Sequence, residues 1–156
     1  MSQSSLINSY TTSEKVKQIV DRLSSETSRI HLKGLIGSSL SLVLQAIIKK
    51  TEKPFLIILN EKEEAAYYLN DLEQMIGGND VLFYPSSYRR PYQIEETDNA
   101  NVLLRSEVLN RINSRKKPAV IVTYPEALFE KVVTRKELEK KYLESFRWRP
   151  NFYRFY

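Results

Sequence analysis

The chain contains no cysteine and only one histidine, His31. The lack of cysteine excludes disulfides, thiolate metal sites and thiol catalysis, and it fits a reducing cytosol. A single histidine excludes a zinc site built from several imidazoles. Because His31 falls in a predicted strand, we interpret it as a structural residue.

Long apolar runs are also missing. None approaches the roughly 18 residues that a membrane-spanning helix needs. The first residues have neither the basic start nor the apolar block of a signal peptide. We therefore expect a cytoplasmic protein with no membrane partner. Its 156 residues are enough for one domain with a hydrophobic core.

The positive charge is concentrated near the C-terminus. Residues 1–130 contain 16 basic and 16 acidic side chains, whereas residues 131–156 contain 8 basic and 3 acidic ones, which accounts for the net charge of +5. Since the body of the chain is neutral, its net charge gives no support for binding to nucleic acid.

Hydrophobic periodicity predicts strands that alternate with helices. Apolar runs predict strands at residues 28–33, 55–59, 81–84 and 119–123. Amphipathic spacing predicts helices at about residues 16–23, 38–50, 60–76 and 98–114, with shorter helical pieces at 126–131 and 134–142. This order predicts an α/β fold: a single three-layer domain with a mainly parallel sheet.

The sequence also predicts which surfaces of these elements are apolar and where the domain begins and ends. The run at 55–59 is apolar throughout, which is typical of a parallel strand covered on both faces. The helix at 98–114 should bury Leu104, Val108 and Ile112, which share one face. We expect the domain to span residues 11–144, after a flexible N-terminus at residues 1–10.

The segment from Gly34 to Ser41 has the position and spacing of a phosphate-binding loop. In the pattern G-x-x-x-x-G-K-[ST], backbone N–H groups hold phosphates and the lysine contacts the β/γ oxygens. Here Ser39 replaces the second glycine and Leu40 replaces the lysine. A charge-assisted bond is typically worth ~1.5–3 kcal/mol, so its loss lowers affinity by roughly one to two powers of ten or more. We interpret the loop (Gly34, Gly37, Ser38, Ser39, Leu40 and Ser41) as structural, with weak anion binding by its free N–H groups as the alternative.

The acidic residue that an ATPase needs for magnesium is also missing at the expected places. Such a ligand usually follows an apolar strand. The strands at 55–59, 81–84 and 119–123 run into Asn60, Pro85 and Tyr124. We therefore expect no catalytic residue, cofactor or metal in this chain.

Arginine and tyrosine are interleaved in the loop after residue 84. These side chains could contact phosphates and stack on bases, or form a contact with another protein. We favour a structural alternative, in which the tyrosines pack over the sheet edge and the arginines pair with nearby glutamates. The residues concerned are Tyr88, Arg89, Arg90 and Tyr92.

Residues 145–156 contain six aromatic residues and three arginines in no apolar period. We expect an irregular tail that is truncated or non-native. The alternative is that this tail binds a membrane or nucleic acid.

Taken together, these features resemble the N-terminal UvrB-like region of the bacterial transcription-repair coupling factor, Mfd. The resemblance covers about residues 12–144, and the order and spacing of its motifs are more specific than any one motif. The matching segments are His31 to Ser41, the strand Phe55 to Asn60, the turn Phe83 to Pro85, Pro91-Tyr92 with Glu95 and Asp98, and Val122 to Leu128.

This resemblance implies a degenerate P-loop, helicase-like domain of the kind that begins UvrB, without an ATP site of its own. It implies a parent DNA-repair protein whose motor uses ATP and Mg²⁺ to translocate on DNA, displaces stalled RNA polymerase and recruits UvrA. The partners of the module would then be other domains of the parent, with weak DNA binding at most, and it can hold the motor in an autoinhibited state. The family would continue after about Lys141 into a β-rich domain.

Two alternatives stay open. One is a small P-loop NTPase with an unusual loop. The other is a UvrB-type DNA-binding fragment, although proteins of that kind keep the loop lysine and insert a long tyrosine-rich hairpin. This chain has Leu40 and only a short loop at residues 85–97, and both differences favour the coupling factor.

Overall fold

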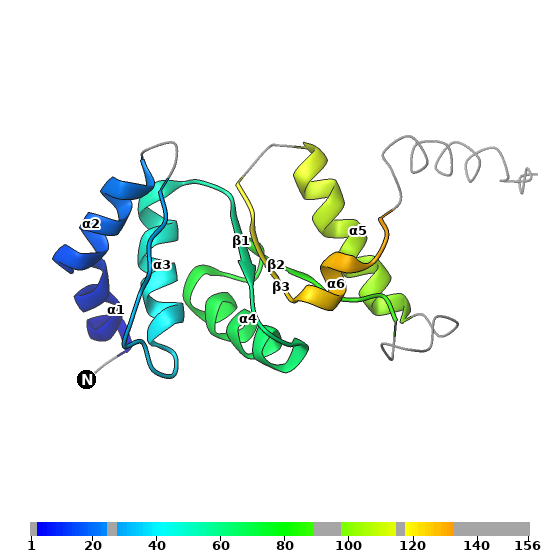
Figure 1. The fold of residues 1–156 in the computed structure, drawn as a ribbon, viewed down its shortest axis with the longest axis horizontal. Helices are drawn as coiled ribbons and strands as arrows, with labels where there is room; N and C mark the ends of the chain where they lie inside the picture. Colours follow the sequence, from blue (N-terminus) through cyan, green and yellow to red (C-terminus); the bar gives the residue numbers. More distant parts are fainter. Residues whose placement is uncertain (1–2, 25–27, 89–97, 115–117, 133–156) are drawn as a thin grey trace, which may run out of the picture.

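The computed structural model describes residues 3–24, 28–88, 98–114 and 118–132 (Figure 1). Strands and helices alternate from α3 onward, as the hydrophobic periodicity predicts. In chain order the elements are α1 (Gln3–Thr11), α2 (Glu14–Leu23), α3 (Ser39–Thr51), β1 (Phe55–Ile58), α4 (Lys62–Ile76), β2 (Val81–Tyr84), α5 (Asn99–Ser114), β3 (Val120–Thr123) and α6 (Pro125–Phe129).

The three strands form one parallel sheet in the order β1-β3-β2. Phe55 of β1 and Val81 of β2 both lie opposite Val120 of β3. Parallel strands need a crossover connection. Here α4 connects β1 to β2, which lie on either side of β3, and α5 connects β2 to its neighbour β3. The prediction of an α/β fold with a parallel sheet is confirmed, while its P-loop or helicase-like identity stays a prediction.

Helices lie on both sides of this sheet. In Figure 1, α3 and α4 lie on one side and α5 and α6 on the other. The main hydrophobic core joins Leu72 of α4 and Val108 of α5 to Val122 in the central strand β3. Because Val120, Val122 and Thr123 are all buried, β3 is covered on both of its faces.

A second, smaller core joins the N-terminal helices to α3. Its buried members are Val16 of α2 and Val43, Ala46 and Ile47 of α3, and Tyr10 of α1 packs against them. Thus α1 forms where we expected a flexible segment at residues 1–10. Its packing against α3 supplies the apolar burial that a short helix needs to be stable.

The strand predicted at residues 28–33 is wrong. These residues form neither a helix nor a strand, and His31 and Leu32 are exposed. Figure 1 shows the segment running along α3, beside the N-terminal helices rather than in the sheet. Its alternating polar residues cannot be buried on both faces, which a position inside a parallel sheet requires.

Two burial predictions also need correction. β1 is an edge strand that is covered on one face only, because Leu56 is 56% exposed and Ile58 is 53% exposed. On α5 the buried residues are Arg105 and Val108, whereas Ile112 is 51% exposed. The helix is therefore rotated away from its apolar stripe, so that Arg105 reaches partners in the interior.

Candidate functional site

The predicted phosphate loop closes on itself by hydrogen bonds. The N–H of Ile36 donates to the Ser39 hydroxyl at 2.7 Å, and the N–H of Ser39 donates to the carbonyl of Ile36 at 3.2 Å. Gly34 (φ 80°) and Gly37 (φ 56°) have left-handed backbones, which glycine adopts at little cost. The Ser39 side chain thus occupies a backbone donor that a phosphate-binding loop would offer to its ligand.

Two further loop residues, Ser38 and Leu40, face other parts of the chain. The Ser38 hydroxyl lies 3.3 Å from the Tyr67 hydroxyl of α4, and the Leu40 side chain is half-buried at the start of α3. Ile36 is 85% exposed at the tip of the loop. The position that carries the lysine in a functional loop is therefore a half-buried leucine here.

Ser41 marks the position whose hydroxyl binds Mg²⁺ in a functional loop. Here it is completely buried, and its hydroxyl has no hydrogen-bond partner among the described residues. One turn later, Gln45 is also completely buried, and both polar atoms of its amide lack a partner in the described part of the chain. Neither side chain can reach a metal ion in solvent from this geometry.

A buried ion pair organises the carboxyl ends of β2 and β3. Nε of Arg105 on α5 lies 3.5 Å from Oε1 of Glu130, which follows α6, and both side chains are about nine-tenths buried. One guanidinium nitrogen also donates to the carbonyls of Pro85 at 2.8 Å and Ala127 at 3.1 Å. The guanidinium lies over the Tyr84 ring, 4.2 Å from its centroid, in the geometry of a cation–π contact.

Glu130 in turn holds the chain that leaves β2. Its carboxylate accepts hydrogen bonds from the N–H of Ser87 at 2.8 Å, from the Ser86 hydroxyl at 3.1 Å and from the Ser87 hydroxyl. The N–H of Ser86 donates to the Tyr124 hydroxyl at 2.9 Å. The carboxyl edge of the sheet is where parallel α/β proteins usually bind ligands. Here, the donors and acceptors just described are already hydrogen-bonded to one another.

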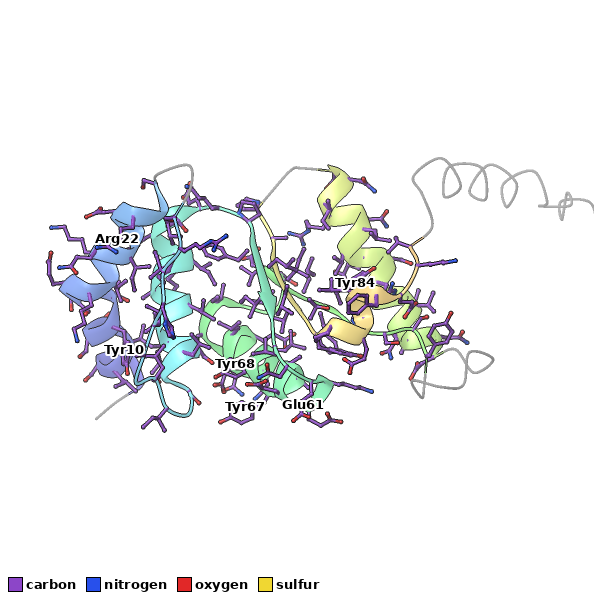
Figure 2. All side chains as sticks on the ribbon, viewed as in Figure 1. Tyr10, Arg22, Glu61, Tyr67, Tyr68 and Tyr84 are labelled. Carbon is purple, nitrogen blue, oxygen red and sulfur yellow. The ribbon has the colours of Figure 1, made fainter. Side chains whose placement is uncertain are left out.

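We call Tyr84, Ser86, Ser87, Arg105, Tyr124 and Glu130 the carboxyl-edge network. Figure 2 labels one member, Tyr84, on the side of the sheet where α5 lies. Sequence reasoning missed its two charged members. The only signal for Arg105 is an arginine between the apolar residues Leu104 and Val108 of α5, and no local pattern points to Glu130.

Two tyrosines of the carboxyl-edge network have altered acidity. Burial raises the pKa of Tyr84, while the Arg105 charge opposes this shift and the Glu130 charge adds to it. Burial also raises the pKa of Tyr124, although the hydrogen bond from Ser86 lowers it in part. Both hydroxyls therefore keep their protons in the folded chain at pH values where an ordinary tyrosine ionises.

These shifts predict a loss of stability in alkali. A raised pKa stabilises the folded state fully below the ordinary tyrosine value of about 10, and this contribution disappears as the pH rises through the folded pKa. We expect urea unfolding to show a falling free energy above about pH 10. The double variant Tyr84→Phe with Tyr124→Phe should lose less stability over the same pH interval, and an equal loss would refute this origin.

The other predicted contact residues are only partly described. Tyr88 is half-buried, and its N–H lies 3.4 Å from the Ser86 hydroxyl that it donates to. Arg89, Arg90 and Tyr92 lie outside the described residues, as do the helical piece at 134–142 and the tail at 145–156. Their predicted roles stay predictions.

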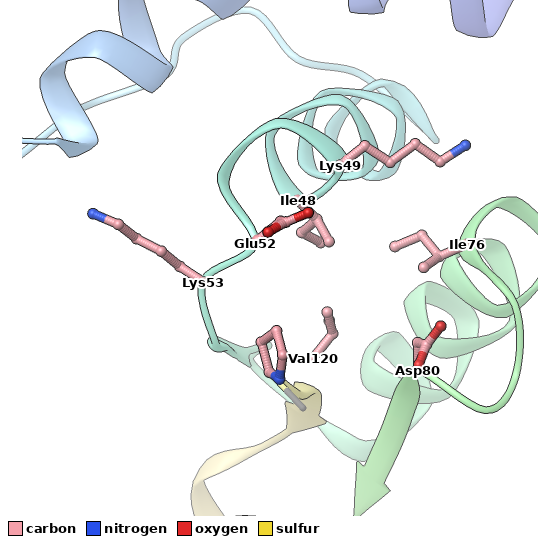
Figure 3. Close-up of a pocket in the computed structure, with 8 residues that line it drawn as sticks. Ile48, Lys49, Glu52, Lys53, Ile76, Asp80 and Val120 are labelled. Atoms are coloured by element: carbon pink, nitrogen blue, oxygen red, sulfur yellow. The ribbon is translucent and has the colours of Figure 1, made fainter. Parts of the chain in front are cut away.

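The larger cavity lies at the opposite edge of the sheet, where the strands begin, and has a volume of about 550 Å³ (Figure 3). Ile48, Ile76 and Val120 form its apolar wall, and Lys49 and Lys53 point away from it. Its lining residues are Ile48, Lys49, Glu52, Lys53, Ile76, Asp80, Pro118 and Val120. A smaller cavity of about 200 Å³ lies between α5 and the chain that follows α6, beside the Arg105–Glu130 pair.

Comparisons with known proteins found no match among family models, curated proteins or solved structures. Within the described ranges, no three His, Asp or Glu side chains come together in a group that could hold a metal ion. No helix of the described chain is long and apolar enough to cross a membrane.

Proposed function

We propose that this chain is a non-catalytic interaction module of a transcription-coupled nucleotide excision repair factor. In this proposal the ATP-dependent DNA translocase, the displacement of RNA polymerase and the recruitment of UvrA belong to other parts of the parent protein. The observation that carries the proposal is the self-closed loop. Its Ile36 N–H is bonded to Ser39, Leu40 stands in place of the lysine, and the Ser41 hydroxyl is buried.

The carboxyl-edge network supports the same proposal. Two segments on which the resemblance rests, Phe83 to Pro85 and Val122 to Leu128, meet there. The Thr123 hydroxyl donates to the Tyr84 carbonyl at 2.8 Å, and Arg105 bridges the carbonyls of Pro85 and Ala127. These bonds occupy the edge of the sheet with structural contacts, which suits a module that presents a surface rather than an active site.

The loop is tested by isothermal titration of the full chain with Mg-ATP. We expect no binding, because the loop lacks the cation that contacts the β/γ oxygens. Micromolar binding that disappears in a Ser41→Ala variant would overturn the proposal and favour a small P-loop NTPase.

The resemblance also implies that the module can hold the motor in an autoinhibited state. This role is tested by adding the purified chain to a coupling factor that lacks its own N-terminal region. We expect the chain to lower the ATPase rate of that motor in a saturable way. An unrelated α/β domain at the same concentration serves as the control. An unchanged rate at every concentration of the chain would contradict the role.

A further inference from the structure

The outer edge of β1 is an unpaired, apolar strand edge. Within the described residues β1 pairs only with β3, and Leu56 and Ile58 project from the uncovered face with more than half of their surfaces exposed. An apolar edge of this kind is a template for pairing with a further strand. The question is therefore which strand fits it.

Backbone directions limit the positions that can pair. The N–H groups of Phe55 and Leu59 both donate to the neighbouring strand segment, to the carbonyls of Ala119 and Thr123 at 2.9 Å. Because backbone groups alternate in direction along a strand, the N–H and C=O groups of the residues between them point to the open edge. Those residues include Leu56 and Ile58.

Both ends of this edge are blocked. Pro54 has no N–H to donate. The N–H of Asn60 already donates to the carboxylate of Glu64 at 3.0 Å. Among the bonds of the described residues, only Leu56 and Ile58 are left with a free donor and a free acceptor on the outer side of β1.

The sequence around β1 is complementary to its own reverse. Residues 52–62 read EKPFLIILNEK, with Ile57 at the centre. If two copies pair antiparallel about Ile57, Leu56 lies opposite Ile58 of the partner subunit, and each pair can exchange two backbone hydrogen bonds. Just beyond the ends of β1, the same register brings Lys53 toward Glu61 of the partner subunit. Parallel pairing in register would instead place like charges together.

We propose that β1 pairs antiparallel with β1 of a second copy of this chain, so that the two sheets become continuous across a two-fold axis at Ile57. This register uses both free positions of the edge and brings the exposed side chains of Leu56 and Ile58 together. The Lys53 ammonium donates to the carbonyl of Leu23, the last residue of α2, at 2.8 Å and keeps further donors for the opposite carboxylate. Glu61 is exposed and its backbone is extended, so its carboxylate can approach Lys53 of the partner subunit.

The pairing should be reversible. A four-residue strand edge buries less than the ~800 Å² per partner that is usual for stable complexes. We expect sedimentation velocity of the full chain to show a monomer–dimer equilibrium that shifts with protein concentration. A monomer at every concentration would overturn the proposal, whether the edge stays open or is covered by the chain itself.

The edge is tested with Ile58→Lys, which places a charge at the pairing position. We expect the dissociation constant to rise by about tenfold or more, because a charged side chain on an edge strand opposes pairing with a second strand. Leu103→Lys is the matched control, since Leu103 is a 71% exposed apolar residue on α5. An equal effect of the two variants would contradict pairing through β1.

The register is tested by reversing the charges of two exposed residues, which should leave the fold intact. Lys53→Glu and Glu61→Lys should each raise the dissociation constant, because each places like charges opposite one another. The double variant should restore it toward that of the unaltered chain. A double variant as weak as the single variants would overturn this register.

Discussion

Replacing Glu130 with alanine is expected to lower the free energy of unfolding by about 3–5 kcal/mol, as is usual when one partner of a buried ion pair is removed. The variant leaves the Arg105 guanidinium buried without its countercharge, and it leaves the donors of Ser86 and Ser87 without their acceptor. Urea denaturation followed by circular dichroism measures the loss.

The matched control is Glu126→Ala, in the same region of the chain. Glu126 is exposed in the first turn of α6, where a carboxylate contributes typically 0.3–1 kcal/mol through the helix dipole. If both variants cost the same, Glu130 does not anchor the carboxyl-edge network. A double-mutant cycle with Arg105→Met separates the ion pair from the serine contacts, because the cost of Glu130→Ala should be smaller once the buried cation is gone.

The sequence was sufficient to place most of the regular structure. The apolar runs at 55–59, 81–84 and 119–123 contain β1, β2 and β3, because a strand next to a buried core needs apolar side chains. It failed at residues 28–33, where alternation of polar and apolar residues is equally compatible with an extended segment along α3. Local periodicity cannot show whether a partner strand is available.

The candidate site was harder to predict than the fold. The replacement of the second glycine by Ser39 and of the lysine by Leu40 in the phosphate-loop pattern could be recognised from spacing, because the motif is local. The pairing of Arg105 with Glu130 could not be recognised from the sequence, because the two residues meet only after α5 and α6 have packed on the sheet. The position of β1 could not be predicted for the same reason. Its apolar run predicted burial on both faces, but its place at the edge depends on the strand order, which is set by the whole sheet.

Replacing Leu72 with alanine should have an effect of similar size, about 2–5 kcal/mol, through a different mechanism. Leu72 is completely buried where α4 packs on the sheet, and truncation both removes apolar contact and leaves a cavity. Leu72→Met keeps the volume and should cost less than about 1.5 kcal/mol. Thermal and urea unfolding measure both variants.

Leu103→Ala provides the control for Leu72, because it removes the same atoms from a helical leucine that is 71% exposed. We expect a change within about 0.5 kcal/mol for this surface substitution. If Leu72→Ala were as mild, α4 would not pack on the sheet as described.

The Leu72 variant also gives a prediction for the pairing of β1. Since α4 packs mainly on β2 and β3, losing Leu72 should destabilise each copy without altering the outer edge of β1, and the dissociation constant of the folded dimer should stay unchanged.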